Sequence, residues 1–220
     1  MNGALHYLAR STRWDISRAM SRLSQLNANP TQGMVDSIRY LAGYLRGTVD
    51  FKLGGVRPEG SSTIHSYSDS DHHCDKLFTS RSQTGVLVLL NGIPCHWRSN
   101  RQPVTADSPA CAEIYAMKEG VRDSRLFHWV ADEMGIDTPL PFVLQIDSKQ
   151  AHSFQRDTCP KSKIRGSFDM RGDWVQELRD LSVVETKLVD TSRNLADIFT
   201  KCLPRTNFER IFNMINKYYE

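Results

Sequence analysis

A β-hairpin signal in the middle of the chain, followed by a long helical pattern, constrains the fold most strongly. Residues 86–90 and 93–97 are apolar, β-prone runs, and Asn91-Gly92 between them suits a two-residue type I′ turn. Residues 64–68 form a further β-prone run, and residues 108–134 carry a helical apolar pattern. Strands followed by a long helix predict an α/β domain.

The rest of this domain alternates helices with short strands. We expect a buried strand at 142–146, a short helix to about residue 155, a helix at 169–181, a strand at 183–189 and a terminal helix. Residues 206–209, Thr-Asn-Phe-Glu, have the sequence of a capping box at the start of that last helix. The predicted element order is β-β-β-α-β-α-α-β-α.

The chain divides into three parts by composition. Residues 1–50 carry helical apolar stripes, with Asp15 as a candidate cap. Residues 51–62 are rich in Gly, Pro and Ser and are predicted to be a linker. Residues 63–220 form the α/β domain. We expect the N-terminal helices to pack apart from the core of that domain, because the linker separates them.

The bulk composition is that of a globular protein with a mildly basic balance. The 220 residues carry a net charge of +3, which permits a nucleic-acid partner without arguing for one. The five cysteines are odd in number and form no C-x-x-C pair, so a disulfide framework is not expected. The chain contains no run of 18 apolar residues. We therefore expect an intracellular, cytoplasmic protein that does not engage a membrane.

Four acidic residues occur where their side chains can meet. Asp69 follows a β-prone run, and Asp147 follows the buried strand 142–146. Glu113 lies in the first turns of the long helical pattern, and Asp197 lies at the start of the last helical region. Carboxylates from two strands and two helices can converge at one edge of a sheet. Such hard oxygen ligands suit Mg²⁺ or Mn²⁺, and two such ions can clamp a phosphodiester for attack by water.

A set of basic residues follows the predicted strands or lies in predicted loops. These are the candidate nucleic-acid-binding residues Arg98, Arg101, Lys149, Lys161, Lys163 and Arg165. Contact with backbone phosphates is one interpretation of this set. Simple solvation of exposed basic side chains is the other, and the two stay open on the sequence.

Six short motifs surround the acidic residues in a fixed order. They lie at residues 67–71 (Tyr-Ser-Asp-Ser-Asp), 81–85, 97–103, 112–116, 145–151 and 194–201 (Asn-Leu-Ala-Asp-Ile-Phe-Thr-Lys). In this order they resemble the ribonuclease H domain of Ty1/copia-type retrotransposon polyproteins. Residues 3–48 are similar to the last stretch of the reverse transcriptase that precedes that domain. The resemblance covers nearly the whole chain.

The resemblance implies an RNase H-like fold, a five-stranded mixed sheet flanked by helices. It implies endonucleolytic cleavage of the RNA strand of RNA–DNA hybrids during reverse transcription, with two Mg²⁺ ions that Mn²⁺ can replace. Asp69 would bridge both ions beside Asp147, Glu113 would hold one ion and help to orient the attacking water, and Asp197 would hold the other ion. The partners implied are the hybrid and, if the chain is a piece of a polyprotein, the rest of that polyprotein.

Other functions are weighed against this one. The Y-x-D-D motif of the polymerase is absent, so no polymerase activity is expected. An integrase or transposase of related fold uses its acids in the order Asp, Asp, Glu, whereas this chain has Asp69, Glu113, Asp147. A decayed retroelement fragment that binds nucleic acid without cleaving it stays open as the alternative.

Overall fold

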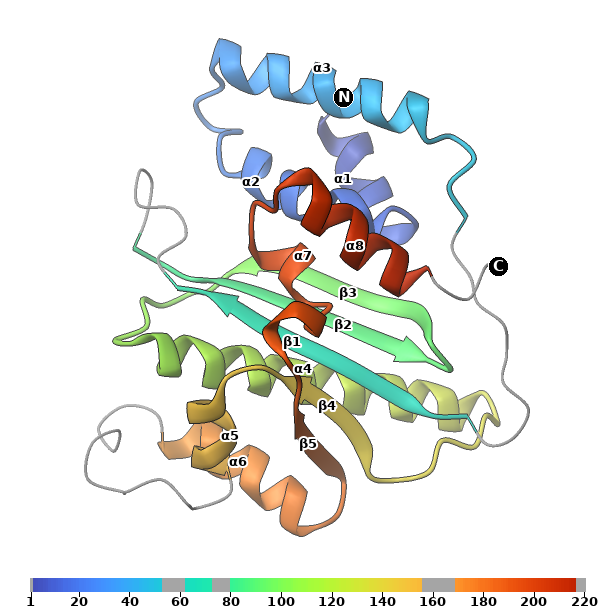
Figure 1. Cartoon of the computed structure of the whole chain (residues 1–220), viewed down its shortest axis with the longest axis vertical. Coiled ribbons are helices and arrows are strands. Elements are labelled where there is room, and N and C mark those ends of the chain that lie inside the picture. The colour runs from blue at the N-terminus through green and yellow to red at the C-terminus, as the bar shows by residue number, and fades with distance from the viewer. Residues whose placement is uncertain (1, 53–61, 73–79, 156–168, 217–220) are drawn as a thin grey trace.

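A computed structural model of the chain describes residues 2–52, 62–72, 80–155 and 169–216 (Figure 1). Most of the predicted linker 51–62 therefore lies outside the described residues. The same is true of Lys161, Lys163 and Arg165.

Five strands form one mixed sheet. They are β1 (Ile64–Asp71), β2 (Gln83–Leu90), β3 (Ile93–Arg101), β4 (Phe142–Ile146) and β5 (Val184–Leu188). The order across the sheet is β3-β2-β1-β4-β5. Strands β1 to β3 are antiparallel neighbours, and β4 runs parallel to both β1 and β5. This is the RNase H-like fold that the resemblance implies, and the predicted α/β class is confirmed.

The hairpin between β2 and β3 has the predicted turn. Asn91 and Gly92 both adopt positive φ angles, 54° and 80°. A type I′ turn requires positive φ at both central residues, and Asn and Gly tolerate it best. The strands of this hairpin are longer than the apolar runs in the sequence, because polar residues extend both of them toward the edge that carries the acidic residues.

One face of the sheet is covered by three helices. They are α4 (Pro109–Glu133), α5 (Lys149–Gln155) and α6 (Asp169–Asp180). The hydroxyl of Ser108 accepts a hydrogen bond from the backbone N–H of Cys111 and caps α4, as expected of a Ser before the first helical turn. Buried aliphatic residues of α4, including Ile114, Met117 and Val121, pack against the sheet as the main core.

The opposite face carries the C-terminal elements, namely the 3₁₀ turn η2 (Thr191–Arg193), the short α7 (Asp197–Thr200) and α8 (Arg205–Ile215). The predicted capping box is wrong. Pro204 precedes the first helical residue with extended angles of −57° and 153°, and no side chain caps the helix. Thr206 is consequently already inside α8 and cannot act as its N-cap.

The first fifty residues are helical, as predicted. They form α1 (Asn2–Ser11), the 3₁₀ turn η1 (Trp14–Ile16), α2 (Ser17–Ser24) and α3 (Gln32–Gly47). Asp15 does not cap a helix, which corrects the prediction: it lies within η1, paired with Arg13 at 2.8 Å and accepting a hydrogen bond from Tyr44. None of the helices in the described ranges combines the length and apolar character needed to cross a membrane.

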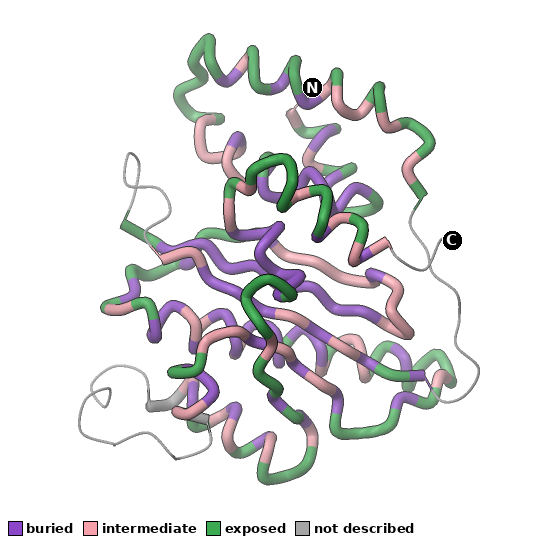
Figure 2. The backbone as a smooth tube through the Cα atoms, in the orientation of Figure 1, coloured by how far each residue is buried: buried purple, intermediate pink, exposed green. Residues whose placement is uncertain are grey.

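The prediction that these helices pack apart from the following domain holds only in part: most of their buried hydrophobic residues, from Leu5 to Leu41, form a cluster of their own, but other contacts join the helices to the domain. Trp14 is only 1% exposed and packs in one cluster with residues of β2, α7 and α8, among them Leu87, Phe199 and Ile211. The indole N–H of Trp97 in β3 donates to the carbonyl oxygen of Ala9 at 2.6 Å. The buried residues in Figure 2 accordingly run from the sheet into the N-terminal helices, while the outer side of α3 is exposed.

Candidate metal centre

Three carboxylates from three elements lie together at one edge of the sheet. One oxygen each of Asp69, Glu113 and Asp147 lies within 4.8 Å of the other two. Strands β1 and β4 are parallel, with Tyr67 opposite Gln145, so Asp69 and Asp147 each follow that pair by two residues. Glu113 reaches them from the start of α4, where its Oε1 accepts a hydrogen bond from the backbone N–H of Ser70 at 3.3 Å.

The fourth predicted acid lies beside this group. Asp197 is the first residue of α7, and its Oδ1 lies 2.7 Å from the ammonium nitrogen of Lys201. The same ammonium lies 3.4 Å from Oδ1 of Asp69, and the hydroxyl of Thr200 donates to Oδ2 of Asp69. The structure thus brings three of the predicted acids together and joins the fourth to them through Lys201.

Thr200 and Lys201 were not predicted as site residues. A signal for both was present, because they follow Asp197 by three and four residues, the spacing that places side chains on one face of a helix. They also belong to the motif at 194–201 that carries the resemblance. The motif was used to locate Asp197, and its last two residues were not given a role.

Burial raises the pKa of three carboxyl groups at this site, Asp69, Glu113 and Asp197. Burial raises the pKa of Glu113 well above its usual value, and the charges of Asp69 and Asp147 add to the effect. Burial also raises the pKa of Asp69, against the opposing charge of Lys201. Burial and the charge of Asp69 raise the pKa of Asp197 to about 6. Negative groups held this close in a partly dry site favour a bound proton or a bound cation.

The arrangement fits a divalent cation. Carboxylate oxygens are the donors that Mg²⁺ and Mn²⁺ prefer. Two oxygens on one Mg²⁺ lie at most about 4.2 Å apart, since each lies about 2.1 Å from the ion. The three carboxylates lie within 4.8 Å, so small side-chain rotations would bring them to that geometry. Asp69, Glu113 and Asp147 are therefore the residues that would hold such an ion, with Asp197 at its side.

The residues predicted to contact phosphates differ in the exposure and the pairing of their side chains. The guanidinium of Arg98 donates to Glu119 at 3.0 Å and to Asp123 at 2.7 Å, so its charge is already compensated within the protein. Arg101 ends β3 and is exposed. Lys149 is exposed at the first residue of α5, two residues after Asp147. Nucleic-acid binding by these residues stays a prediction.

Comparison with known proteins identifies relatives along nearly the whole chain. The Retrovirus-related Pol polyprotein from transposon TNT 1-94 of Nicotiana tabacum is 28% identical over 209 residues, which are 94% of this chain and 15% of that protein. The truncated transposon Ty1-A Gag-Pol polyprotein of Saccharomyces cerevisiae is 26% identical over 218 residues, which are 96% of this chain and 18% of that protein. The chain is a homologue of the Pol polyproteins of Ty1/copia-type transposons. It spans less than a fifth of the length of these Pol relatives.

Two other proteins that are similar to this chain are not named as Pol polyproteins. Secreted RxLR effector protein 161 of Plasmopara viticola is 32% identical over 122 residues, which are 56% of this chain and 84% of that protein. A crystal structure of LC11-RNase H1 in complex with an RNA/DNA hybrid covers 63% of this chain and 94% of that one, with 13% identity and a TM-score of 0.48. No protein-family model matches the sequence.

Proposed function

We propose that this Pol homologue is a metal-dependent endonuclease that cleaves the RNA strand of RNA–DNA hybrids during retrotransposon reverse transcription. The observation that carries the proposal is the convergence of Asp69, Glu113 and Asp147 at one edge of an RNase H-like sheet. The relationship to Pol polyproteins supports it, since a transposon that copies RNA into DNA produces such hybrids.

Each acidic residue has a role that follows from its position. Asp69 and Asp147 leave adjacent parallel strands and form the centre of the site, where a shared cation would bind. Divalent cations at such a site lower the pKa of water and stabilise charge that develops on phosphate oxygens. Glu113 approaches from α4, where it would hold a cation and help to orient a nucleophilic water. Asp197 approaches from α7 and completes the acidic set.

Other residues of the chain orient these acids. The hydroxyl of Thr200 donates to Oδ2 of Asp69 and so restricts the orientation of that carboxylate. Lys201 pairs with both Asp69 and Asp197 and balances part of their charge. Both residues therefore act as positioning residues that set the carboxylate geometry before a cation binds.

The substrate is held through its backbone. Arg101 and Lys149 lie at the edge of the sheet that carries the carboxylates, where cationic side chains can neutralise phosphates without reading sequence. The predicted contacts at Lys161, Lys163 and Arg165 belong to the same proposal, although they lie outside the described residues. Preference for a hybrid would come from contacts to 2′-hydroxyl groups of the RNA strand.

A protein that binds nucleic acid without cleaving it is the second candidate. The two candidates differ in one measurable property. A binder retains affinity for hybrids but produces no cleavage products.

Cleavage of a labelled hybrid distinguishes the candidates directly. The full chain is incubated with an RNA–DNA hybrid labelled on the RNA strand, in Mg²⁺ and in EDTA, beside DNA–DNA and RNA–RNA duplexes. The nuclease proposal predicts RNA cleavage of the hybrid alone, in Mg²⁺ alone. Binding of the hybrid with no cleavage in Mg²⁺ or Mn²⁺ would reject the nuclease and support the binder.

A further inference from the structure

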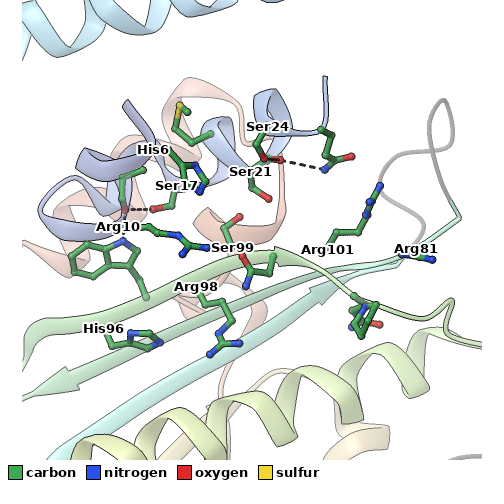
Figure 3. A pocket seen from close by; sticks show the side chains of 17 residues that line it. His6, Arg10, Ser17, Ser21, Ser24, Arg81, His96, Arg98, Ser99 and Arg101 are labelled. Atoms are coloured by element: carbon green, nitrogen blue, oxygen red, sulfur yellow. Dashed lines mark hydrogen bonds between the residues drawn. The ribbon is translucent and has the colours of Figure 1, made fainter. Parts of the chain in front are cut away.

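An open groove of about 770 Å³ lies between the N-terminal helices and β3 (Figure 3). One wall is formed by residues of α1 and α2, and the other by residues 96–103 of β3 and the segment after it. The lining residues in the described part of the chain include four arginines and two histidines but no aspartate or glutamate. The groove is thus a cationic surface that exists only because the N-terminal helices dock on the sheet.

Three of the arginines are exposed and come from three different segments. Arg10 belongs to α1, Arg81 precedes β2, and Arg101 ends β3. Arg98 differs from Arg10 and Arg101, because its side chain points away from the groove toward the α4 side of the sheet (Figure 3), where it pairs with Glu119 and Asp123. Arg10 and Arg101 are therefore the two cations on which binding of a ligand in the groove would depend.

The spacing of these cations suits a linear polyanion. The hydrogen bond from Trp97 to the carbonyl of Ala9 places Arg10 beside Trp97, and Arg101 follows Trp97 by four strand residues. Four residues of a strand span about 13 Å. Successive phosphates of one strand rise by about 3.4 Å along the duplex axis, so the backbone positions of the two arginines are separated by the length of about four nucleotides.

The groove leads to the carboxylate cluster. Arg101 pairs with Gln83, and Gln83 pairs with Asp71, two residues after Asp69. The Arg101 backbone therefore lies two strand spacings, about 10 Å, from the end of β1. The wall near this end is fixed, because the amide of Gln83 donates to Ser21 of α2 at 3.0 Å and to Ser99 of β3 at 2.9 Å.

The side chains that line the groove favour contact with the sugar–phosphate backbone of a nucleic acid over contact with its bases. Among the described residues that line the groove, Trp97 is the one large aromatic residue, and it packs in the hydrophobic cluster with its indole N–H already bonded to Ala9. The described lining therefore offers no free indole, phenol or phenyl ring on which a base would stack. Guanidinium groups that can form two parallel hydrogen bonds to a phosphate remain.

We propose that this groove binds the sugar–phosphate backbone of the nucleic acid on the side of β3, about 10 to 25 Å from the cleavage site. The inference rests on the proposed function for the identity of the substrate, and it assigns the N-terminal helices a part in binding it. Arg10 makes the groove a composite of both halves of the chain. A ribonuclease H domain without these helices would hold the same hybrid with fewer phosphate contacts.

Two paired variants of the full chain test the groove. Arg10→Ala/Arg101→Ala removes two groove cations, and Arg39→Ala/Arg46→Ala removes the same charge from exposed positions on α3 outside the groove. Binding is measured in EDTA over a series of salt concentrations with a hybrid of about 24 base pairs. The groove variant should lose about 10-fold in affinity, and its log–log salt slope should fall by about 1.8, which is two contacts at about 0.9 each. The α3 variant should bind like the wild type.

A short hybrid separates this proposal from the nuclease proposal. A hybrid of about 6 base pairs, about 20 Å long, covers the carboxylate site but little of the groove. In Mg²⁺, Arg10→Ala alone should cleave the short hybrid like the wild type and the long hybrid with a raised KM. An unchanged salt slope for the groove variant would overturn the groove proposal, whereas the nuclease proposal would still stand. If the groove variant has a reduced salt slope but the wild-type chain cleaves no hybrid, the groove proposal stands and the nuclease proposal is rejected.

Discussion

The ammonium nitrogen of Lys201 lies 3.4 Å from Oδ1 of Asp69. The same nitrogen lies 2.7 Å from Asp197, so one cation of the chain serves two of the acids assigned to the metal site. Burial opposes the charged form of Lys201, but the charges of these acids outweigh it and raise its pKa. The acidic site therefore carries its own counter-charge before a divalent cation arrives.

Replacing Lys201 with Met should destabilise the chain in EDTA. It leaves the buried carboxylates of Asp69 and Asp197 without their cation, and breaking a partly buried pair of this kind costs about 2 kcal/mol or more. Lys187→Met is the control, since its pair with Glu185 is exposed on both sides and is worth at most about 1 kcal/mol. Chemical denaturation measures both, and equal losses for the two variants would contradict the role of Lys201.

The stability of the metal-free chain should depend on pH through Glu113. Its pKa is raised by burial and by Asp69 and Asp147, so the folded chain holds this proton more tightly than the unfolded chain. The stability that this group contributes is full below its unfolded pKa and is lost as pH rises through the folded pKa. Glu113→Gln removes the charge and retains an oxygen that can accept from Ser70.

Denaturant midpoints in EDTA test this expectation. Glu113→Gln should be more stable than the wild type at about pH 8, and the difference should shrink toward about pH 4. Addition of Mg²⁺ should then stabilise the wild type at pH 8 but not the variant, because a bound cation offsets the cost of the charged acids. A difference that stays constant across this pH range would show that Glu113 is not held in a strained charged state.

Gly85 in β2 should resist replacement because α7 lies directly against it. A Cβ at this position would lie 2.7 Å from Cγ2 of Thr200 and 2.8 Å from the carbonyl oxygen of Ala196. Gly85→Ala should therefore cost more than about 1 kcal/mol in unfolding free energy, and it should lower cleavage by displacing the hydroxyl that holds Asp69. Gly43→Ala in α3, where the new Cβ meets nothing within 4 Å, should stabilise by about 0.5 to 1 kcal/mol.

The N-terminal helices and the α/β domain should unfold together. Trp14 is 1% exposed in the cluster shared with β2, α7 and α8, so Trp14→Ala should lower the unfolding free energy by about 3 to 5 kcal/mol. Tyr40→Ala, at a residue that is 81% exposed, should change it by less than about 0.5 kcal/mol. Two separate melting transitions, with only the first shifted by Trp14→Ala, would show two independent units.

The sequence predicted the local structure of the α/β domain well, for local reasons. The turn at Asn91-Gly92 requires positive φ angles that few other residue pairs accept, and Ser108 before an apolar helical pattern marks a helix start. The capping box failed because Pro204 already fixes the helix start two residues before the predicted N-cap, Thr206. A local pattern is decisive only where no stronger local constraint competes with it.

Local sequence patterns do not predict contacts between segments that are distant in the chain. Arg98 looked like a solvent-facing phosphate contact, but alternation along β3 turns it toward Glu119 and Asp123 on α4. Trp14 carries no mark in the sequence that would assign it to one cluster with Leu87, which lies 73 residues further along the chain. The acidic residues were found because motifs surround them, whereas Lys201 and Arg10 acquire their roles only when α7 and α1 are placed on the sheet.

The most direct measurement of the central claim compares two Asp→Asn variants in the hybrid cleavage assay. Asp147→Asn removes one charge from the carboxylate cluster with little change in shape, and Asp36→Asn removes the same charge from an exposed position on α3. Asp147→Asn should reduce Mg²⁺-dependent cleavage by at least about 100-fold while hybrid binding in EDTA is retained, since a loss of two to three orders of magnitude is typical when an electrostatic catalytic group is removed. Asp36→Asn should cleave like the wild type. Cleavage by Asp147→Asn at the wild-type rate would contradict the assignment of these carboxylates as a metal-dependent active site.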